Sequence, residues 1–305
     1  MGNIGESTLA KLRNKAKEQN IQFQQLLILF CQEEFVRRLS YSKYKDILIL
    51  KGGFLLYSIS GFATRPTIDA DYLLKDHPND LKTIETLIIN ILSTPTVNDF
   101  INIEFQSLEK ITEFKEYHGI RVKLIGKIGS TKTPFSIDIG VGDLIIPGPV
   151  KRFLPTLLKN FQESEILTYS LESIISEKLQ VIVSMMELTS RMKDFYDIYY
   201  LASNYNFDGL KLQEAIKETF SKRATPIDKD SINNLSTLID DTNFQKQWNN
   251  FCNNTIHKKI DFVETINLII VFTAPLCDAI INEIEYQNMW SSETKCYKKY
   301  FETLI

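Results

Sequence analysis

Hydrophobic positions recur every three or four residues along the first 45 residues, and this spacing predicts α-helix. A short apolar segment, Asp46–Leu50, then ends at a Lys-Gly-Gly turn, after which residues 54–60 again have a helical pattern. From Thr67 the pattern changes to the period of two that is typical of half-buried strands. It predicts an amphipathic helix over 80–92 and strands over 67–74, 101–108, 119–128 and 134–141.

Beyond residue 168 the apolar positions keep the helical spacing to the end of the chain, with no further strand pattern. The sequence therefore predicts an α+β protein in two parts. Residues 1–165 would form a mixed β-sheet with helices, including the helical lead-in, and residues 166–305 an all-helical domain.

Composition narrows the class of protein. With 44% hydrophobic and 24% charged residues, the chain can bury a core and is not intrinsically disordered. Its four cysteines lack CxxC spacing and follow no signal-peptide pattern, so we expect reduced thiols and a cytoplasmic protein. No apolar run reaches the roughly 20 residues of a membrane span, so we expect no membrane partner.

The net charge of −3 excludes a uniformly basic nucleic-acid coat, so RNA binding would need a local patch. Basic residues do outnumber acidic ones between residues 119 and 161. They are Arg121, Lys123, Lys127, Lys132, Lys151, Arg152 and Lys159, against Asp138 and Asp143. These cations could contact phosphates, or they could guard a solvated strand edge against aggregation. The sequence leaves both interpretations open.

Three aspartates carry the strongest chemical signal. Asp69 and Asp71 are two residues apart in a predicted strand, so their side chains would share one face. Asp138 lies in another predicted strand, and the three carboxylates would converge if the strands are neighbours. Each like-charge pair at about 4 Å costs roughly 4 kcal/mol at an effective dielectric of about 20, so such a cluster needs cations. Hard oxygen ligands favour Mg²⁺ or Mn²⁺. Taken alone, an Asp-x-Asp pair is also common at a solvated strand edge.

Carboxylate-bound divalent ions support in-line transfer at phosphorus. The Gly52-Gly53 turn precedes a predicted helix, where backbone N–H groups could approach a triphosphate. Lys178 lies in an apolar helical pattern and would need a carboxylate or phosphate counter-ion unless its stem extends to solvent. Asp194 and Asp197 share one helix face and could be either site residues or a salt-bridge cluster.

Five ordered motifs in this chain resemble those of the AbiEii/AbiGii toxin family. These proteins are nucleotidyltransferase-like toxins of bacterial type IV toxin–antitoxin and abortive infection systems. The resemblance extends from about Leu9 to Ala279. The motifs are Leu50–Gly53, Arg65–Asp71, Ile137–Asp143, Glu177–Leu179 and Arg191–Asp197.

The resemblance implies a nucleotidyltransferase-type sheet, an NTP substrate, Mg²⁺ or Mn²⁺, and transfer of NMP to an acceptor hydroxyl on RNA, with tRNA favoured. It also implies growth arrest and a cognate antitoxin partner, an AbiEi-like regulator. The implied catalytic residues are Asp69, Asp71, Asp138, Lys178, Asp194 and Asp197, the first three as metal ligands. The implied nucleotide-binding residues are Lys51, Gly52, Gly53, Arg65, Thr67, Arg191 and Lys193.

Two alternatives remain open at this point. The acceptor could be a protein or a small molecule, or the chain could be a non-catalytic nucleotide- or RNA-binding module with the same fold.

Overall fold

The computed structural model describes residues 4–113, 117–186 and 190–299. The chain forms two compact units. The first comprises residues 1–142 and 150–168, and the second comprises residues 143–149 and 169–305. The predicted boundary between residues 165 and 166 falls inside the last strand of the first unit.

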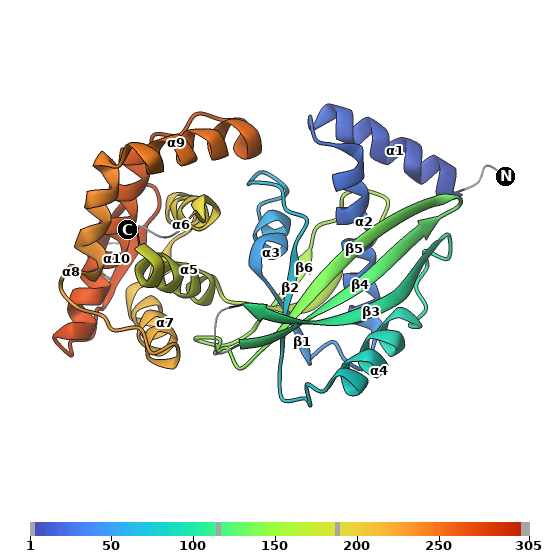
Figure 1. Ribbon diagram of the computed structural model, residues 1–305, viewed down its shortest axis with the longest axis horizontal. Coiled ribbons are helices and arrows are strands. Elements are labelled where there is room, and N and C mark those ends of the chain that lie inside the picture. Colours follow the sequence, from blue (N-terminus) through green and yellow to red (C-terminus); the bar gives the residue numbers. More distant parts are fainter. Residues whose placement is uncertain (1–3, 114–116, 187–189, 300–305) are drawn as a thin grey trace. The chain divides into compact units, whose positions relative to one another are not determined.

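The first unit is built on a seven-stranded mixed sheet with the strand order β3-β4-β5-β2-β1-β7-β6 (Figure 1). The prediction of a mixed sheet with helices in this part of the chain is confirmed. The strands are β1 (Leu48–Lys51), β2 (Ala70–Leu74), β3 (Ile101–Glu113), β4 (Tyr117–Ile128), β5 (Thr131–Val141), β6 (Val150–Leu154) and β7 (Ser164–Thr168). Strands β6 and β7 were not predicted, because five residues each give too little alternation to stand out from their proline-rich surroundings.

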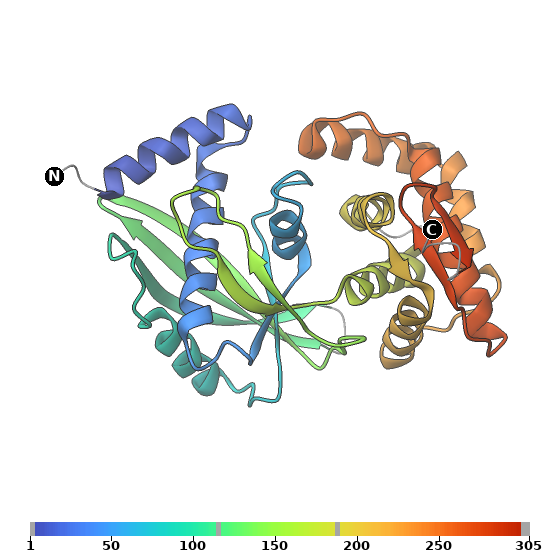
Figure 2. The ribbon, with the colours of Figure 1, turned by 180° about the vertical axis from the view of Figure 1, so that it is seen from behind.

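Helix α2 is the centre of the first unit's core. It lies against the sheet, where it contacts β5 and β7, and it is seen in front of the strands in Figure 2. On β5, Phe135, Ile137 and Ile139 are buried, while Ser136 and Asp138 alternate with them on the opposite face. The helices of this unit are α1 (Ile4–Glu18), α2 (Phe23–Tyr41), α3 (Gly52–Ile59) and α4 (Leu81–Leu92).

Helix α2 also carries buried charges that are compensated internally. Glu34 is fully buried and accepts from Arg37 Nη1 at 2.6 Å and from Arg38 Nε at 3.2 Å. Thr96 and Asn98, from the segment before β3, donate to the same carboxylate at 2.7 and 2.8 Å. This network fixes α2 against the loop that leads into β3.

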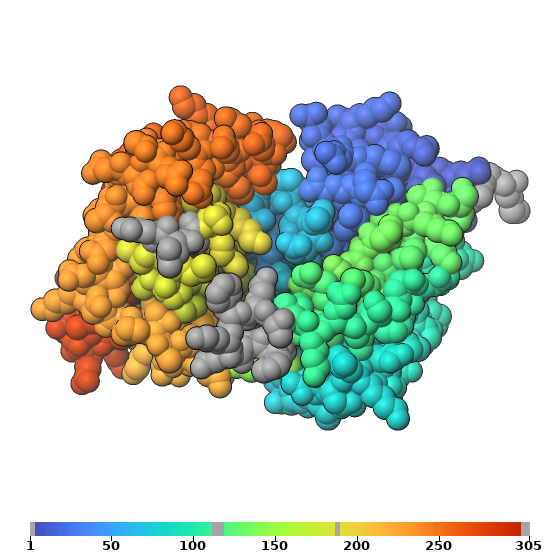
Figure 3. Space-filling view, viewed as in Figure 1, coloured from blue at the N-terminus to red at the C-terminus, as the bar shows by residue number. Residues whose placement is uncertain are grey.

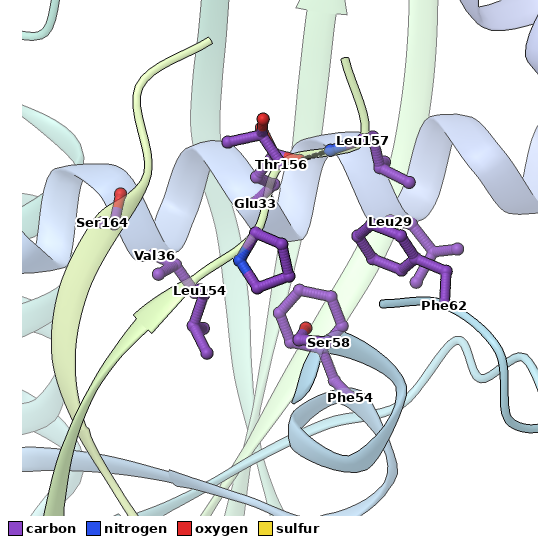
Figure 4. A pocket seen from close by; sticks show the side chains of 11 residues that line it. Leu29, Glu33, Val36, Phe54, Ser58, Phe62, Leu154, Thr156, Leu157 and Ser164 are labelled. Atoms are coloured by element: carbon purple, nitrogen blue, oxygen red, sulfur yellow. Dashed lines mark hydrogen bonds between the residues drawn. The ribbon is translucent and has the colours of Figure 1, made fainter. Parts of the chain in front are cut away.

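A small hollow lies between α2, α3 and the loop that joins β6 to β7 (Figure 4). Its lining is mainly apolar, and Glu33 is the one ionisable residue among the eleven that line it. Burial raises the pKa of Glu33, whose carboxylate accepts the Leu157 N–H at 2.7 Å. A lining without cations does not suit a triphosphate.

The second unit is mostly helical but not entirely so. It contains α5 (Leu171–Met185), α6 (Met192–Asn204), α7 (Gly209–Lys222), α8 (Asp230–Asn233), the 3-10 helix η2 (Asn234–Asp240), α9 (Thr242–Phe251), the π-helical turn η3 (Cys252–Ile256) and α10 (Phe262–Ile281). Three short strands form a second sheet in the order β10-β9-β8. They are β8 (Phe207–Asp208), β9 (Asn288–Ser291) and β10 (Cys296–Lys299).

This second sheet corrects the prediction of an all-helical domain. Its strands have two to four residues, which is too short for a recognisable alternation. Tertiary packing holds them instead. Trp290 of β9 is fully buried, donates from its indole N–H to the Ala202 carbonyl at 2.7 Å and packs its ring against Phe272 of α10.

Among the described residues, α10 is the one helix that is long and apolar enough to cross a membrane by length and composition. Half of its apolar window is buried inside the structure, and Ile266, Ile269 and Phe272 are fully buried. These contacts make α10 the core helix of the second unit.

The segment 143–149 belongs to the second unit although it is flanked by strands of the first. The backbone N–H of Ile146 donates to Ser173 Oγ at 2.8 Å, and its carbonyl accepts from Ser170 Oγ. Ser170 also caps α5, since its Oγ accepts the Ser173 N–H at 3.1 Å. The segment is therefore fastened to the start of α5.

Candidate active site

A row of charged residues crosses the first sheet. Lys51 of β1 pairs with Asp71 of β2, Asp71 pairs with Asp138 of β5, and Asp138 pairs with Arg121 of β4. Residues directly opposite on neighbouring strands project from the same face. We call these four residues the charged row; Glu109 of β3 continues it opposite Arg121. The surface of β4 and β5 is open to the outside in Figure 3 (green).

Two cations therefore flank the two adjacent carboxylates of the charged row. Arg121 donates to Asp138 through Nε at 2.8 Å and Nη2 at 2.7 Å, a bidentate ion pair. Lys51 stands opposite Asp71 on the other side. The repulsion expected between converging aspartates is offset by the protein itself. Arg121 was grouped with the basic patch in the sequence, and its partnership with Asp138 was missed.

Asp69 lies one residue before β2 and is exposed, whereas Asp71 lies in the strand and is half-buried. A local turn shapes the backbone at Asp69. The Asp69 N–H donates to Thr67 Oγ1 at 3.1 Å, and Thr67 is buried. The Thr67 hydroxyl, predicted to bind nucleotide, is thus engaged with the backbone of Asp69.

The Gly52-Gly53 turn packs directly against these residues. Gly52 has a φ of +70°, and a Cβ built on it would lie 2.0 Å from Asp71 Oδ2. A Cβ on Gly53 would lie 3.0 Å from Thr67 Oγ1 and 3.4 Å from Arg65 Nη2. The N-terminus of α3, whose first N–H groups have no partner within the helix, is therefore adjacent to Asp71. The fold thus places Lys51, Gly52 and Asp138 next to Asp71, and Thr67 and Arg65 next to Gly53.

The predicted residues of the second unit form their own cluster. Lys178 of α5 contacts Asp194 Oδ1 at 2.7 Å and Asp197 Oδ2 at 2.6 Å, both on α6. Arg191, just before α6, contacts Asp194 Oδ2 through Nε at 2.6 Å. The two aspartate side chains are 1% exposed and that of Lys178 is 12% exposed. Lys178 therefore does not extend its stem to solvent, and both aspartates contact it.

The electrostatics of Asp194 follow from this geometry. Burial by itself would raise the pKa of Asp194, but the charges and hydrogen bonds of Lys178 and Arg191 outweigh it and hold the pKa at about 2. Lys193, the remaining predicted residue of this cluster, is half-buried on the first turn of α6.

The lowered pKa gives a testable pH dependence. A carboxyl whose folded-state pKa lies below its unfolded value of about 3.9 stabilises the protein above that value and loses this contribution as pH falls through the folded value. We expect Asp194 to contribute about 2 kcal/mol at pH 7 through this shift, lost between about pH 4 and pH 2. Urea unfolding of wild type and Asp194→Asn across this range measures it. A stability difference independent of pH would contradict the assignment.

A third cation, Arg223, carried no sequence signal because it follows α7 as an ordinary helix-terminal arginine. It contacts Asp143 Oδ1 at 3.0 Å, Glu177 Oε2 at 3.6 Å and Gln180 Oε1 at 3.0 Å. Asp143 and Glu177 belong to two of the five motifs. Arg223 thus joins the segment 143–149 to α5.

The basic patch of residues 119–161 is partly neutralised by carboxylates of β3 and β5. Lys127 contacts Glu104 at 2.6 Å, Lys123 contacts Glu109, and Arg121 contacts Asp138. The two glutamates lie on β3 and meet the lysines across the strand pair, which a count along the sequence does not show. Three of the seven cations are therefore already paired within the sheet.

The described residues include no group of three His, Cys, Asp or Glu side chains arranged to hold a metal ion. The hard oxygen donors of this part of the sheet are the carboxylates of Asp69, Asp71 and Asp138, and Arg121 engages the last of them. Mg²⁺ at phosphoryl-transfer sites is held by one or two carboxylates, with waters and substrate phosphates completing its shell. The residues thus fit a divalent ion that binds together with an NTP.

The first unit thus has a glycine turn at a helix start, Asp71 against this turn and Asp138 on the adjacent parallel strand. The family model described as nucleotidyl transferase AbiEii toxin, type IV toxin–antitoxin system, matches residues 34–267. The chain belongs to this family and is an enzyme of nucleotidyl transfer.

Two solved structures from Helicobacter pylori are similar to this chain. A proposed nucleotidyltransferase has 15% sequence identity and a TM-score of 0.47, with 87% of this chain and 98% of that chain covered. The protein JHP933 has 14% identity and a TM-score of 0.41, with 84% and 93% covered. A comparison with curated proteins gives no match.

Proposed function

We propose that this protein is a divalent-metal-dependent toxin that transfers NMP from an NTP to a hydroxyl group of RNA, with tRNA as the favoured acceptor, and so arrests growth. The supporting observation is the charged row, in which Asp71 and Asp138 are neighbours on one face with the Gly52-Gly53 turn against Asp71. An antitoxin partner and an NTP substrate follow from the family. An AbiEi-like regulator as the antitoxin and a cytoplasmic location are parts of the proposal.

The proposed roles follow the geometry. Asp69 and Asp71 would hold the divalent ion, and the N–H groups at Gly52 and Gly53 would bind the triphosphate. The ion, when bound, supplies neutralisation of the charge on the triphosphate and on the departing pyrophosphate. The acceptor oxygen forms a bond to the α-phosphorus while the bond to pyrophosphate breaks. Asp138 would help to activate the acceptor hydroxyl, as metal ligand or as base, once Arg121 gives up part of its bidentate contact with this carboxylate.

In the second unit, the proposed catalytic residues are Lys178, Asp194 and Asp197. Arg191 and Lys193 are the proposed cations for the phosphate charge. Because Lys178 contacts two carboxylates, its own charge is compensated within this cluster. Its proposed contribution is therefore the fixed position of its ammonium group, which the two aspartates determine.

Transfer to a protein or a small molecule is a second candidate function. The observation that favours it is the cross-strand pairing of Lys123 and Lys127, which reduces the basic surface available to RNA. Labelled NTPs incubated with the protein and with total RNA or total protein distinguish the acceptors. Label that resists RNase and is lost to protease would contradict the RNA acceptor.

Asp69→Ala is expected to lower transfer of label from an NTP by a factor on the order of 100 or more, because several kcal/mol of charge stabilisation are lost. Asp46→Ala, which changes another exposed aspartate before β1, should retain wild-type activity. Cells that overexpress wild type and arrest should carry altered RNA 3′ ends, which sequencing detects. Arrest by Asp69→Ala at wild-type strength would instead support a non-catalytic binding module.

A further inference from the structure

The peptide group that joins Ile68 to Asp69 is held on both of its polar sides. Gln32 Nε2 donates to the Ile68 carbonyl oxygen at 2.7 Å, and the Asp69 N–H donates to Thr67 Oγ1 at 3.1 Å. Because the peptide group is planar, two hydrogen bonds to opposite sides fix its orientation. That orientation sets the direction in which the Asp69 side chain leaves the backbone.

The Gln32 bond comes from the core of the first unit. Gln32 lies on α2 and is fully buried, whereas Ile68 is 51% exposed. Without Gln32 the Ile68 carbonyl could turn toward water. Of the two hydrogen bonds to this peptide group, the one from the Asp69 N–H to Thr67 Oγ1 would remain. Gln32 thus connects the backbone next to an exposed aspartate to the buried helix α2.

The other amide atom of Gln32 makes no compensating contact. Its Oε1 is buried and has no hydrogen-bond partner within the described residues. An unsatisfied buried oxygen is unfavourable for stability. The hydrogen bond that Gln32 donates to the Ile68 carbonyl is therefore the favourable polar contact of this side chain. Gln32 also lies two residues before the part of the chain that the family model matches.

We propose that Gln32 is a positioning residue for Asp69, which acts through the Ile68 carbonyl to hold the Asp69 carboxylate in place for a divalent cation. This inference rests on the proposed function. Outer-shell hydrogen bonds to ligand-bearing groups orient the ligands, and their loss costs metal affinity about 10- to 100-fold.

Gln213 of α7 offers a matched control in the second unit. It is also a buried glutamine that donates to the carbonyl of an exposed isoleucine, from Nε2 to Ile284 O at 2.6 Å. Its Oε1 accepts the Tyr286 N–H at 2.9 Å, so both amide atoms are satisfied. Gln32→Met removes one hydrogen bond and one unsatisfied oxygen, whereas Gln213→Met removes two hydrogen bonds. Gln213→Met should therefore lower the Tm more than Gln32→Met does.

The test is a titration with Mn²⁺, followed by the electron paramagnetic resonance signal of the free ion, on wild type, Gln32→Met, Gln213→Met and Asp69→Ala. We expect Gln32→Met to raise the Kd for Mn²⁺ about tenfold with a Tm close to that of wild type. Gln213→Met should lower the Tm and leave the Mn²⁺ affinity unchanged. Hydrogen exchange of the Asp69 amide, measured without metal, should be faster in Gln32→Met.

The outcomes separate the two proposals. If Asp69→Ala weakens Mn²⁺ binding but Gln32→Met binds as wild type does, the positioning role is wrong and the proposed function stands. If Asp69→Ala binds Mn²⁺ as tightly as wild type, the metal site of the proposed function is wrong and the role of Gln32 falls with it. Equal loss of affinity in Gln32→Met and Gln213→Met would overturn the role of Gln32, because a general loss of stability would then explain the effect.

Discussion

Alanine in place of Gly52 is expected to abolish nucleotidyl transfer while the protein remains folded. Its Cβ would lie 2.0 Å from Asp71 Oδ2, so the Asp71 carboxylate must leave its position between Lys51 and Asp138. A displaced carboxylate cannot hold a cation and triphosphate in the same geometry, and we expect a loss on the order of 1,000-fold, consistent with misplacement of a catalytic group.

Gly61→Ala is the matched control for the backbone. Gly61 has a φ of +61°, close to the +70° of Gly52, but a Cβ there would meet nothing within 4 Å. An alanine in the left-handed conformation costs each variant about 1–2 kcal/mol of folding stability. Only in Gly52→Ala does the new Cβ also meet a carboxylate. Label transfer and thermal unfolding measured on both separate strain from displacement. Equal activity of the two variants would contradict the role assigned to the turn.

Lys178→Met is expected to be the most destabilising of these substitutions. It removes the ammonium group that contacts Asp194 and Asp197, whose side chains are each 1% exposed. Removal of one partner from a buried ion cluster costs about 3–5 kcal/mol, because the remaining charge stays desolvated. Urea unfolding at pH 7 gives the difference in the free energy of unfolding from wild type.

Lys211→Met provides the comparison. Lys211 also stands near an aspartate, Asp208, but at 3.9 Å and with a side chain that is 55% exposed. An exposed pair contributes about 0–1 kcal/mol, so this variant should unfold almost as wild type does. If the two lysine variants lost similar stability, the cluster on α5 and α6 would not be the buried ion group that its geometry indicates.

Strands β4 and β5 of the candidate site were predictable because their alternation is regular. On β5, apolar residues at 135, 137 and 139 alternate with polar ones, and the segment was predicted as a strand. Strands β8 to β10 were not, because a strand of four residues or fewer is stabilised by its packing partners, such as Trp290 against Phe272. Local pattern carries no information about those partners.

The pairing of Arg121 with Asp138 was missed although the sequence contains a signal for it. Gly129 and Ser130 form the two-residue connection between β4 and β5, in which Ile128 pairs with Thr131. A Gly-Ser pair between two alternating segments is a hairpin signal, and the turn fixes the register of both strands. Counting back from the turn places Arg121 opposite Asp138. The pairing of Asp71 with Asp138 has no such local signal, because β2 and β5 are far apart in the chain.

The segment 143–149 has a consequence for how this chain can be altered. It leaves the first unit after Gly142, is fastened to Ser173 and Arg223, and returns at Val150 to form β6. No single division of the gene keeps all residues of both units together. Exchange of the helical half for that of a relative therefore requires three junctions, after residues 142, 149 and 168, and its removal by truncation requires a replacement for seven residues in the middle of the protein.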